Sequence, residues 1–77
     1  MDIESGLKQI IADYDEEIDT GLITRKSLLK NDLGLNSVAM LYLMVAIEDR
    51  FGIDFSQVDL GRLVTVGDVI GEIEKLK

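Results

Sequence analysis

Apolar residues recur at helical spacing near both ends of the chain. Residues 3–14 carry them at intervals of four, three, one and three, which predicts a helix that begins after the capping residue Asp2 and ends in the acidic run that follows. A similar stretch, residues 66–76, begins after Thr65, which forms a capping pair with Asp68. The apolar stripes are Ile3, Leu7, Ile10, Ile11 and Tyr14 in the first helix and Val66, Val69, Ile70, Ile73 and Leu76 in the last.

The stretch from Ser37 to Phe51 is apolar on both sides of a predicted helix, which Gly52 ends. At about 100° per residue, one side holds Met40, Leu43, Met44, Ile47 and Phe51, and the other holds Val38, Leu41, Tyr42 and Val45, ending near Glu48 and Asp49. The first set suffices for packing against the other two helices. The second set leaves two alternatives open: the preceding loop covers it, or it is exposed and docks other proteins, because apolar patches rimmed by charge mark interfaces.

Residues 20–36 lose the helical period but keep apolar side chains, so we expect a long connection held on the core, with a turn near residues 27–30. Its expected anchors are Leu22, Ile23, Leu28, Leu33 and Leu35. Another capping pair, Ser56 and Asp59, predicts a short helix that ends at Gly61. The expected fold is all-α: a small bundle of three main helices plus one short helix, with a long first loop.

Length and composition limit what such a bundle does. Seventy-seven residues predict a single domain over residues 1–77. The 15 acidic residues exceed the 8 basic ones, and the net charge of −7 argues against nucleic-acid binding and favours basic protein surfaces as partners. The chain has no Cys and no His, so we expect neither a metal site nor catalysis. We also expect a cytoplasmic monomer without a membrane span, because no signal peptide is visible and no apolar run approaches roughly 20 residues.

Ser37 is the residue with the clearest chemistry. It follows Asn36, a good capping residue, and so stands in the first turn of the predicted helix. The start of a helix has free N–H groups and a partial positive charge of roughly half a unit, which favours a phosphate group there. Ser37 is a poor catalytic nucleophile because no His can take its proton, but it can accept a group that another enzyme transfers. On these grounds alone, a plain capping role is the favoured interpretation of Ser37.

The residues around Ser37 resemble the attachment site of acyl carrier proteins. Residues 32–38, Asp-Leu-Gly-Leu-Asn-Ser-Val, are similar to the D-L-G-x-D-S-L motif of that family. The helix that follows ends in Ile-Glu-Asp-Arg-Phe at residues 47–51, which resembles the acidic pair and Phe of the family. The similarity covers most of the chain, including its length, its acidity, the four-helix layout, the long first loop and the Thr-Val-Gly-Asp sequence at residues 65–68.

The resemblance implies that a phosphopantetheinyl transferase attaches 4′-phosphopantetheine from coenzyme A to Ser37, beside the flanking cap Asn36. The thiol of that arm would carry acyl, polyketide or aminoacyl thioesters between biosynthetic enzymes, as in fatty acid or polyketide biosynthesis, and the protein itself would catalyse nothing. The implied partners are the transferase and acyl-transferring or adenylating enzymes with basic docking surfaces. The residues expected to dock them are Val38, Leu41, Tyr42, Val45, Glu48 and Asp49.

Some positions depart from the family pattern and indicate a specialised carrier. The departures are Asn36 for Asp, Val38 for Leu, and Ala39 and Tyr42 where fatty-acid carriers commonly have acids. The acidic residues by which fatty-acid carriers are recognised along this helix are therefore reduced mainly to Glu48 and Asp49. This reduction favours a specialised free-standing carrier over a general fatty-acid carrier. Two alternatives remain: a peptidyl or D-alanyl carrier, and an acidic helical interaction module that bears no prosthetic group.

Overall fold

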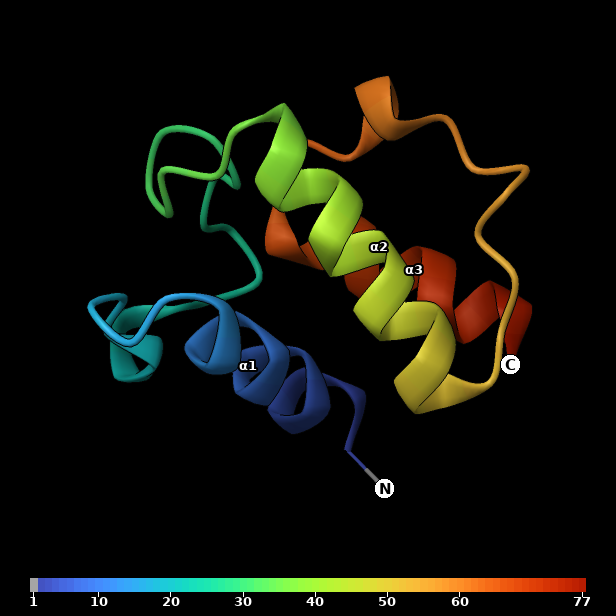
Figure 1. Cartoon of the computed structure of the whole chain (residues 1–77), viewed down its shortest axis with the longest axis horizontal. Coiled ribbons are helices and arrows are strands. Elements are labelled where there is room, and N and C mark those ends of the chain that lie inside the picture. The colour runs from blue at the N-terminus through green and yellow to red at the C-terminus, as the bar shows by residue number, and fades with distance from the viewer. Residues whose placement is uncertain (1) are drawn as a thin grey trace.

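The computed structural model describes residues 2–77 and is built from three helices (Figure 1). Helix α1 spans Ile3–Tyr14, α2 spans Ser37–Phe51 and α3 spans Val66–Leu76. Two 3-10 turns, η1 (Thr20–Leu22) and η2 (Leu60–Arg62), lie in the connections between them. Across residues 2–77 the β-type pairing is limited to an isolated bridge between Leu28 and Thr65. The predicted all-α bundle with a long first loop is confirmed.

Polar side chains and a glycine set the helix ends at the predicted places. The carboxylate of Asp2 accepts a hydrogen bond from the Glu4 amide at 3.0 Å, which caps α1. At the start of α3, Thr65 and Asp68 each accept a hydrogen bond from the other's backbone amide. Helix α2 ends at Gly52, whose φ of 66° lies in the left-handed region that favours glycine.

The short turn before α3 differs from the prediction. The sequence predicted a short helix opened by Ser56 and ended by Gly61, whereas Asp59 caps η2 and Gly61 lies within it. The Asp59 carboxylate accepts a hydrogen bond from the Gly61 amide, two residues later, at 2.9 Å. Asp59 therefore caps η2 itself and does not serve as the second member of a capping box with Ser56. Asp19 and Gly21 make the same contact at 3.0 Å in η1, a turn that the sequence analysis did not predict.

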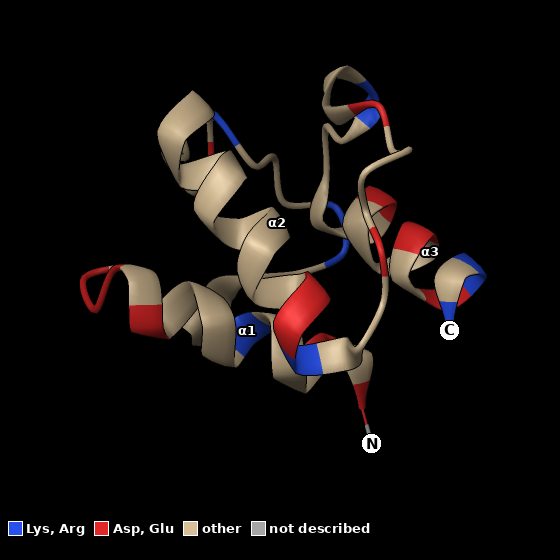
Figure 2. Ribbon diagram, turned by 45° about the vertical axis from the view of Figure 1, so that its right-hand side comes forward, with Lys and Arg blue, Asp and Glu red and all other residues tan. Residues whose placement is uncertain are grey.

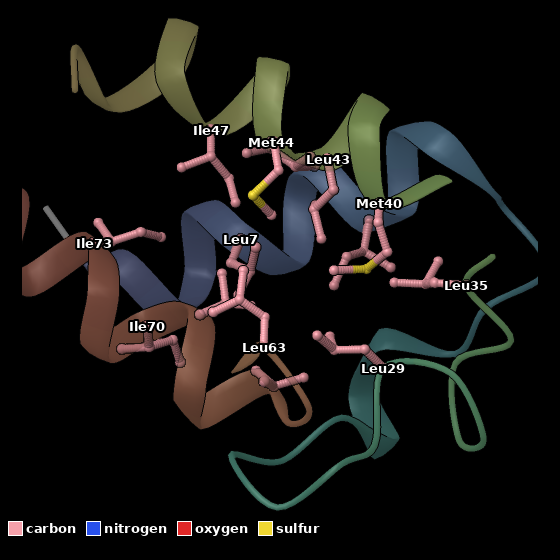
Figure 3. Close-up of a cluster of buried hydrophobic side chains, with 14 of the residues drawn as sticks. Leu7, Leu29, Leu35, Met40, Leu43, Met44, Ile47, Leu63, Ile70 and Ile73 are labelled. Atoms are coloured by element: carbon pink, nitrogen blue, oxygen red, sulfur yellow. The ribbon is translucent and has the colours of Figure 1, made fainter. Parts of the chain in front are cut away.

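The core lies between the three helices and receives side chains from both connections (Figure 3). Its helical members are Leu7, Ile10 and Ile11 of α1, Ala39, Met40, Leu43, Met44 and Ile47 of α2, and Val66, Val69, Ile70 and Ile73 of α3. Two ends of the predicted stripes were wrong, because Tyr14 and Leu76 are exposed in the last turns of α1 and α3. Phe51 is half-buried and packs against the core, as predicted for its side of α2.

Leu29 holds the first connection on the core; it is 1% exposed, and the prediction missed it. Ile23 and Leu35 are buried as expected, whereas Leu22 was wrongly predicted to be an anchor because η1 leaves it 77% exposed. The Leu29 amide donates to the Val64 carbonyl at 3.0 Å and so joins the connection to the segment before α3. The chain that leads to α2 is thus fixed by side-chain burial and by backbone hydrogen bonds.

Candidate functional site

Ser37 is exposed at the first position of α2. Leu35, two residues before Ser37, is buried, and its amide donates to the Leu29 carbonyl at 3.0 Å. Gly34 turns the chain there with a φ of 68°, which strains a residue that has a side chain. The buried leucine and the glycine turn together hold the start of α2 at the surface.

Asn36 supplies the cap of α2. Its side-chain oxygen accepts a hydrogen bond from the Ala39 amide at 2.8 Å, and its carbonyl accepts from the Met40 amide at 2.9 Å. The Ser37 hydroxyl is therefore not the oxygen that caps this helix. Because the first amides of a helix lack partners in a preceding turn, the surroundings of Ser37 keep a positive potential that suits a phosphate group.

A surface hollow of about 260 Å³ opens beside Ser37. Its other lining residues are Lys30, Met40, Leu41, Leu60, Gly61 and Leu63. A second hollow of about 290 Å³ continues along α2 and shares Leu41 and Leu60 with the first. Lys30 offers a cation and the leucines offer apolar surface, so these residues fit a phosphate-linked arm with an apolar cargo. The sequence analysis did not include Lys30 or Leu60 in the site, because their approach to Ser37 depends on how the two connections fold.

The second apolar side of α2 is exposed. Val38, Leu41 and Val45 are 71%, 58% and 64% exposed, which decides against a covering loop. Tyr42 is 45% exposed and packs on Tyr14, with 5.0 Å between the ring centroids. This arrangement makes the exposed side available to another protein.

The two acids at the end of α2 differ in their surroundings. Glu48 is half-buried, and its Oε2 accepts a hydrogen bond from the Phe55 amide at 2.8 Å, whereas Asp49 is exposed. Residues 37–47 contain no charged side chain, and Figure 2 shows charge on α2 only at its C-terminal end. Glu48 thus fastens the connection that follows α2, and Asp49 is the more accessible carboxylate.

Among residues 2–77, three carboxyl groups have lowered pKa values, and each caps a turn or a helix. The Ser5 hydroxyl and then the Glu4 amide lower the pKa of Asp2, and hydrogen bonds from Ser56 lower that of Asp54. The pKa of Asp68 falls because the Thr65 and Val64 amides donate to its ionised form. These shifts therefore reflect local capping.

An exposed serine at a capped helix start, in an acidic helical bundle, is the arrangement of a carrier that receives a phosphate-linked group. A family model described as "Phosphopantetheine attachment site" matches residues 5–73. The chain belongs to this family, that of the acyl carrier proteins. Its prosthetic group is covalently attached 4′-phosphopantetheine, and the protein is a carrier and not a catalyst.

Individual relatives cover nearly the whole chain. "Acyl carrier protein MbtL" of Mycobacterium sp. (strain MCS) is 42% identical over 72 residues, which are 94% of this chain and 80% of that protein. "Acyl carrier protein" of Desulforapulum autotrophicum is 33% identical over 75 residues, 97% of each chain. "Meromycolate extension acyl carrier protein" of Mycolicibacterium aurum is 34% identical over 77 residues, 100% of this chain and 78% of that protein.

Across residues 2–77, no helix has both the length and the apolar character needed to cross a bilayer.

Proposed function

We propose that Ser37 is the attachment residue and that the protein is a specialised free-standing carrier of acyl thioesters in the cytoplasm. The observation that supports this most directly is the exposed Ser37 next to Asn36, which alone supplies the capping oxygen to Ala39. The hydroxyl is thereby left available to an enzyme without loss of the cap.

The residues of this chain have defined roles in the attachment. The proton of Ser37 leaves to a base of the transferase, since this chain has no His. The Oγ–P bond forms as the pyrophosphate P–O bond of coenzyme A breaks, and adenosine 3′,5′-bisphosphate leaves. The start of α2 and the nearby Lys30 stabilise the phosphate charge that results. When bound, the prosthetic group supplies a thiol that forms thioesters.

The names of the relatives support an acyl cargo over an aminoacyl cargo. All three relatives described above are acyl carrier proteins, and two of them carry qualified names that point to specialised members. The uncharged first turns of α2 agree with a specialised carrier, because Ala39 and Tyr42 stand where fatty-acid carriers commonly have acids. Mass spectrometry of the protein purified from the organism that produces it gives the mass of the group bound as a thioester, and this mass distinguishes an acyl from an aminoacyl cargo.

Intact-mass spectrometry tests the attachment residue. Incubation with coenzyme A and a broad-specificity phosphopantetheinyl transferase adds the mass of one phosphopantetheinyl group, and Ser37→Ala abolishes the gain. The matched control is Ser56→Ala, which removes another exposed serine and retains the gain. Circular dichroism establishes that both variants are folded. A mass gain that persists in folded Ser37→Ala would place the attachment elsewhere.

A further inference from the structure

The hollow beside Ser37 continues in two directions along the surface. One continuation follows α2 and is the hollow of about 290 Å³ described above, which we call the α2 branch. The other has a volume of about 190 Å³ and extends between η2 and the first connection, and we call it the η2 branch. The η2 branch shares Lys30, Leu60, Gly61 and Leu63 with the hollow beside Ser37 and adds Leu28, Asn31 and Val64. A flexible arm attached to Ser37 therefore has two routes.

The side chains of the η2 branch suit the chemistry of phosphopantetheine, which has a phosphate at its attached end and amide groups along its length. Lys30 lines both the hollow beside Ser37 and the η2 branch, and lysine is a common binder of phosphate. The side-chain amide of Asn31 can donate hydrogen bonds to other amides and accept hydrogen bonds from them. Leu28 and Leu60 add apolar surface for the methyl groups of the arm.

The α2 branch offers the arm fewer polar partners. Its charged lining residue is the acid Glu48, whose Oε2 already accepts a hydrogen bond from the Phe55 amide at 2.8 Å. Apart from Glu48 and Ser56, the side chains that line it are apolar. Removing amide groups from water without giving them hydrogen-bond partners is unfavourable. The α2 branch therefore suits an apolar group better than it suits the polar arm.

Backbone hydrogen bonds hold the walls of the η2 branch in place. The Leu29 amide donates to the Val64 carbonyl at 3.0 Å, and Leu28 and Thr65 form the isolated bridge. The Val64 amide in turn donates to the Asp68 carboxylate at 3.0 Å. The Val64 side chain nevertheless remains 54% exposed. A site whose walls are already fixed loses little entropy when it binds a flexible chain.

We propose that the phosphopantetheine arm, before a cargo is loaded, lies in the η2 branch, where Lys30 and Asn31 hold it. This inference rests on the proposed attachment at Ser37. The arm in this position leaves uncovered Leu41 and Val45, which line the α2 branch and are mostly exposed. The arm and a protein that approaches α2 then do not compete for one surface.

Two single-cysteine variants test which branch the arm occupies. The chain has no Cys, so in the modified variants the thiol of the arm can pair within the molecule only with the introduced thiol. Val64→Cys places that thiol at the η2 branch and Val45→Cys places it at the α2 branch, and both valines are mostly exposed. In a glutathione redox buffer, intact-mass spectrometry gives the fraction of each protein with an intramolecular disulfide, and hence the effective concentration of the two thiols. We expect this concentration to be about tenfold higher in Val64→Cys than in Val45→Cys.

Charge reversal tests the role of Lys30. In the modified Val64→Cys protein, Lys30→Glu lowers the effective concentration by about threefold or more, because a carboxylate repels the phosphate. The matched control is Lys26→Glu, since Lys26 is an exposed lysine of the same connection that lines neither branch, and it leaves the value within about twofold. Circular dichroism establishes that each variant is folded. Amide NMR spectra of the wild-type chain provide a measurement without cysteines: modification shifts the amides of residues 28–31 and 61–64 more than those of residues 44–45 and 56–58.

The proposal is overturned if Val45→Cys has an effective concentration equal to or above that of Val64→Cys. It is also overturned if Lys26→Glu costs as much as Lys30→Glu, or if the amide shifts concentrate in residues 44–45 and 56–58. A wild-type protein that gains no mass with coenzyme A and a transferase refutes the attachment proposal. A protein that is modified on Ser37 but whose arm pairs better with Val45→Cys refutes only the proposed position of the arm.

Discussion

Two glycines in α3 predict opposite effects of the same substitution. A Cβ atom on Gly71 would meet no atom within 4 Å, whereas a Cβ atom on Gly67 would lie 2.9 Å from the Arg25 carbonyl oxygen. Gly67 is close because its amide donates to that same oxygen at 2.8 Å, which ties α3 to the first connection. We therefore expect Gly71→Ala to stabilise the protein and Gly67→Ala to destabilise it.

The structure sets the size of each effect. In a helix interior, the helix propensity of alanine is more favourable than that of glycine by about 1 kcal/mol, so Gly71→Ala raises the unfolding free energy by about that amount. At Gly67 the new methyl group must push the Arg25 carbonyl away, which strains packing by about 1–3 kcal/mol and weakens a hydrogen bond of about 1 kcal/mol. After the gain in helix propensity of about 1 kcal/mol is subtracted, Gly67→Ala lowers the unfolding free energy by about 1–3 kcal/mol.

Thermal unfolding followed by circular dichroism measures both variants under the same conditions. For a domain of this size about 1 kcal/mol corresponds to about 4–8 °C in Tm, so the two variants melt on opposite sides of wild type. Urea unfolding gives the free energies independently. A Gly67→Ala protein as stable as wild type would refute the close approach between α3 and the first connection. A Gly71→Ala protein of unchanged or lower Tm would refute the open surface at Gly71.

Two further predictions concern the caps. Asn36→Ala removes the acceptor of the Ala39 amide and lowers the unfolding free energy by about 1 kcal/mol. Asn36→Asp keeps an acceptor at this position and serves as the control. Equal Tm values for Asn36→Ala and wild type would contradict the capping role of Asn36. Asp68 is the other case: its pKa is lowered from 3.8, first by the Thr65 amide and then by the Val64 amide. A carboxyl group with a lowered folded-state pKa contributes stability above its unfolded value, and that contribution disappears as pH falls through the folded value. The difference in unfolding free energy between wild type and Asp68→Ala is therefore larger at pH 7 than at a pH well below 3.8, and a difference independent of pH would contradict the prediction.

Local signals in the sequence predicted the helices well. Asp2, Asn36 and Thr65 satisfy amides no more than three residues away, and Gly52 ends α2 through its own backbone conformation. Such contacts require no knowledge of the rest of the fold. The short turn η2 was misplaced because both Ser56 and Asp59 are capping types, and the sequence does not say which of them binds an amide.

The anchors of the first connection were predicted less well for a different reason. Leu22 and Leu29 are the same residue type in the same connection, yet the first is exposed and the second is buried. Which of them enters the core depends on the turn η1 and on the hydrogen bond between the Leu29 amide and the Val64 carbonyl. A contact between residues so far apart in the chain leaves no periodic pattern to read.

The sequence by itself determined that this protein forms helices, where they begin and end, and that Ser37 stands at the start of one, since these features depend on neighbours a few residues apart. The tertiary structure alone decided which apolar side of α2 faces outward, because a helix that is apolar all round has no intrinsic inner face. It also brought Lys30 and Leu60 to the hollow beside Ser37. Burial is a property of the whole packed chain, so only packing could separate the buried side of α2 from the exposed side.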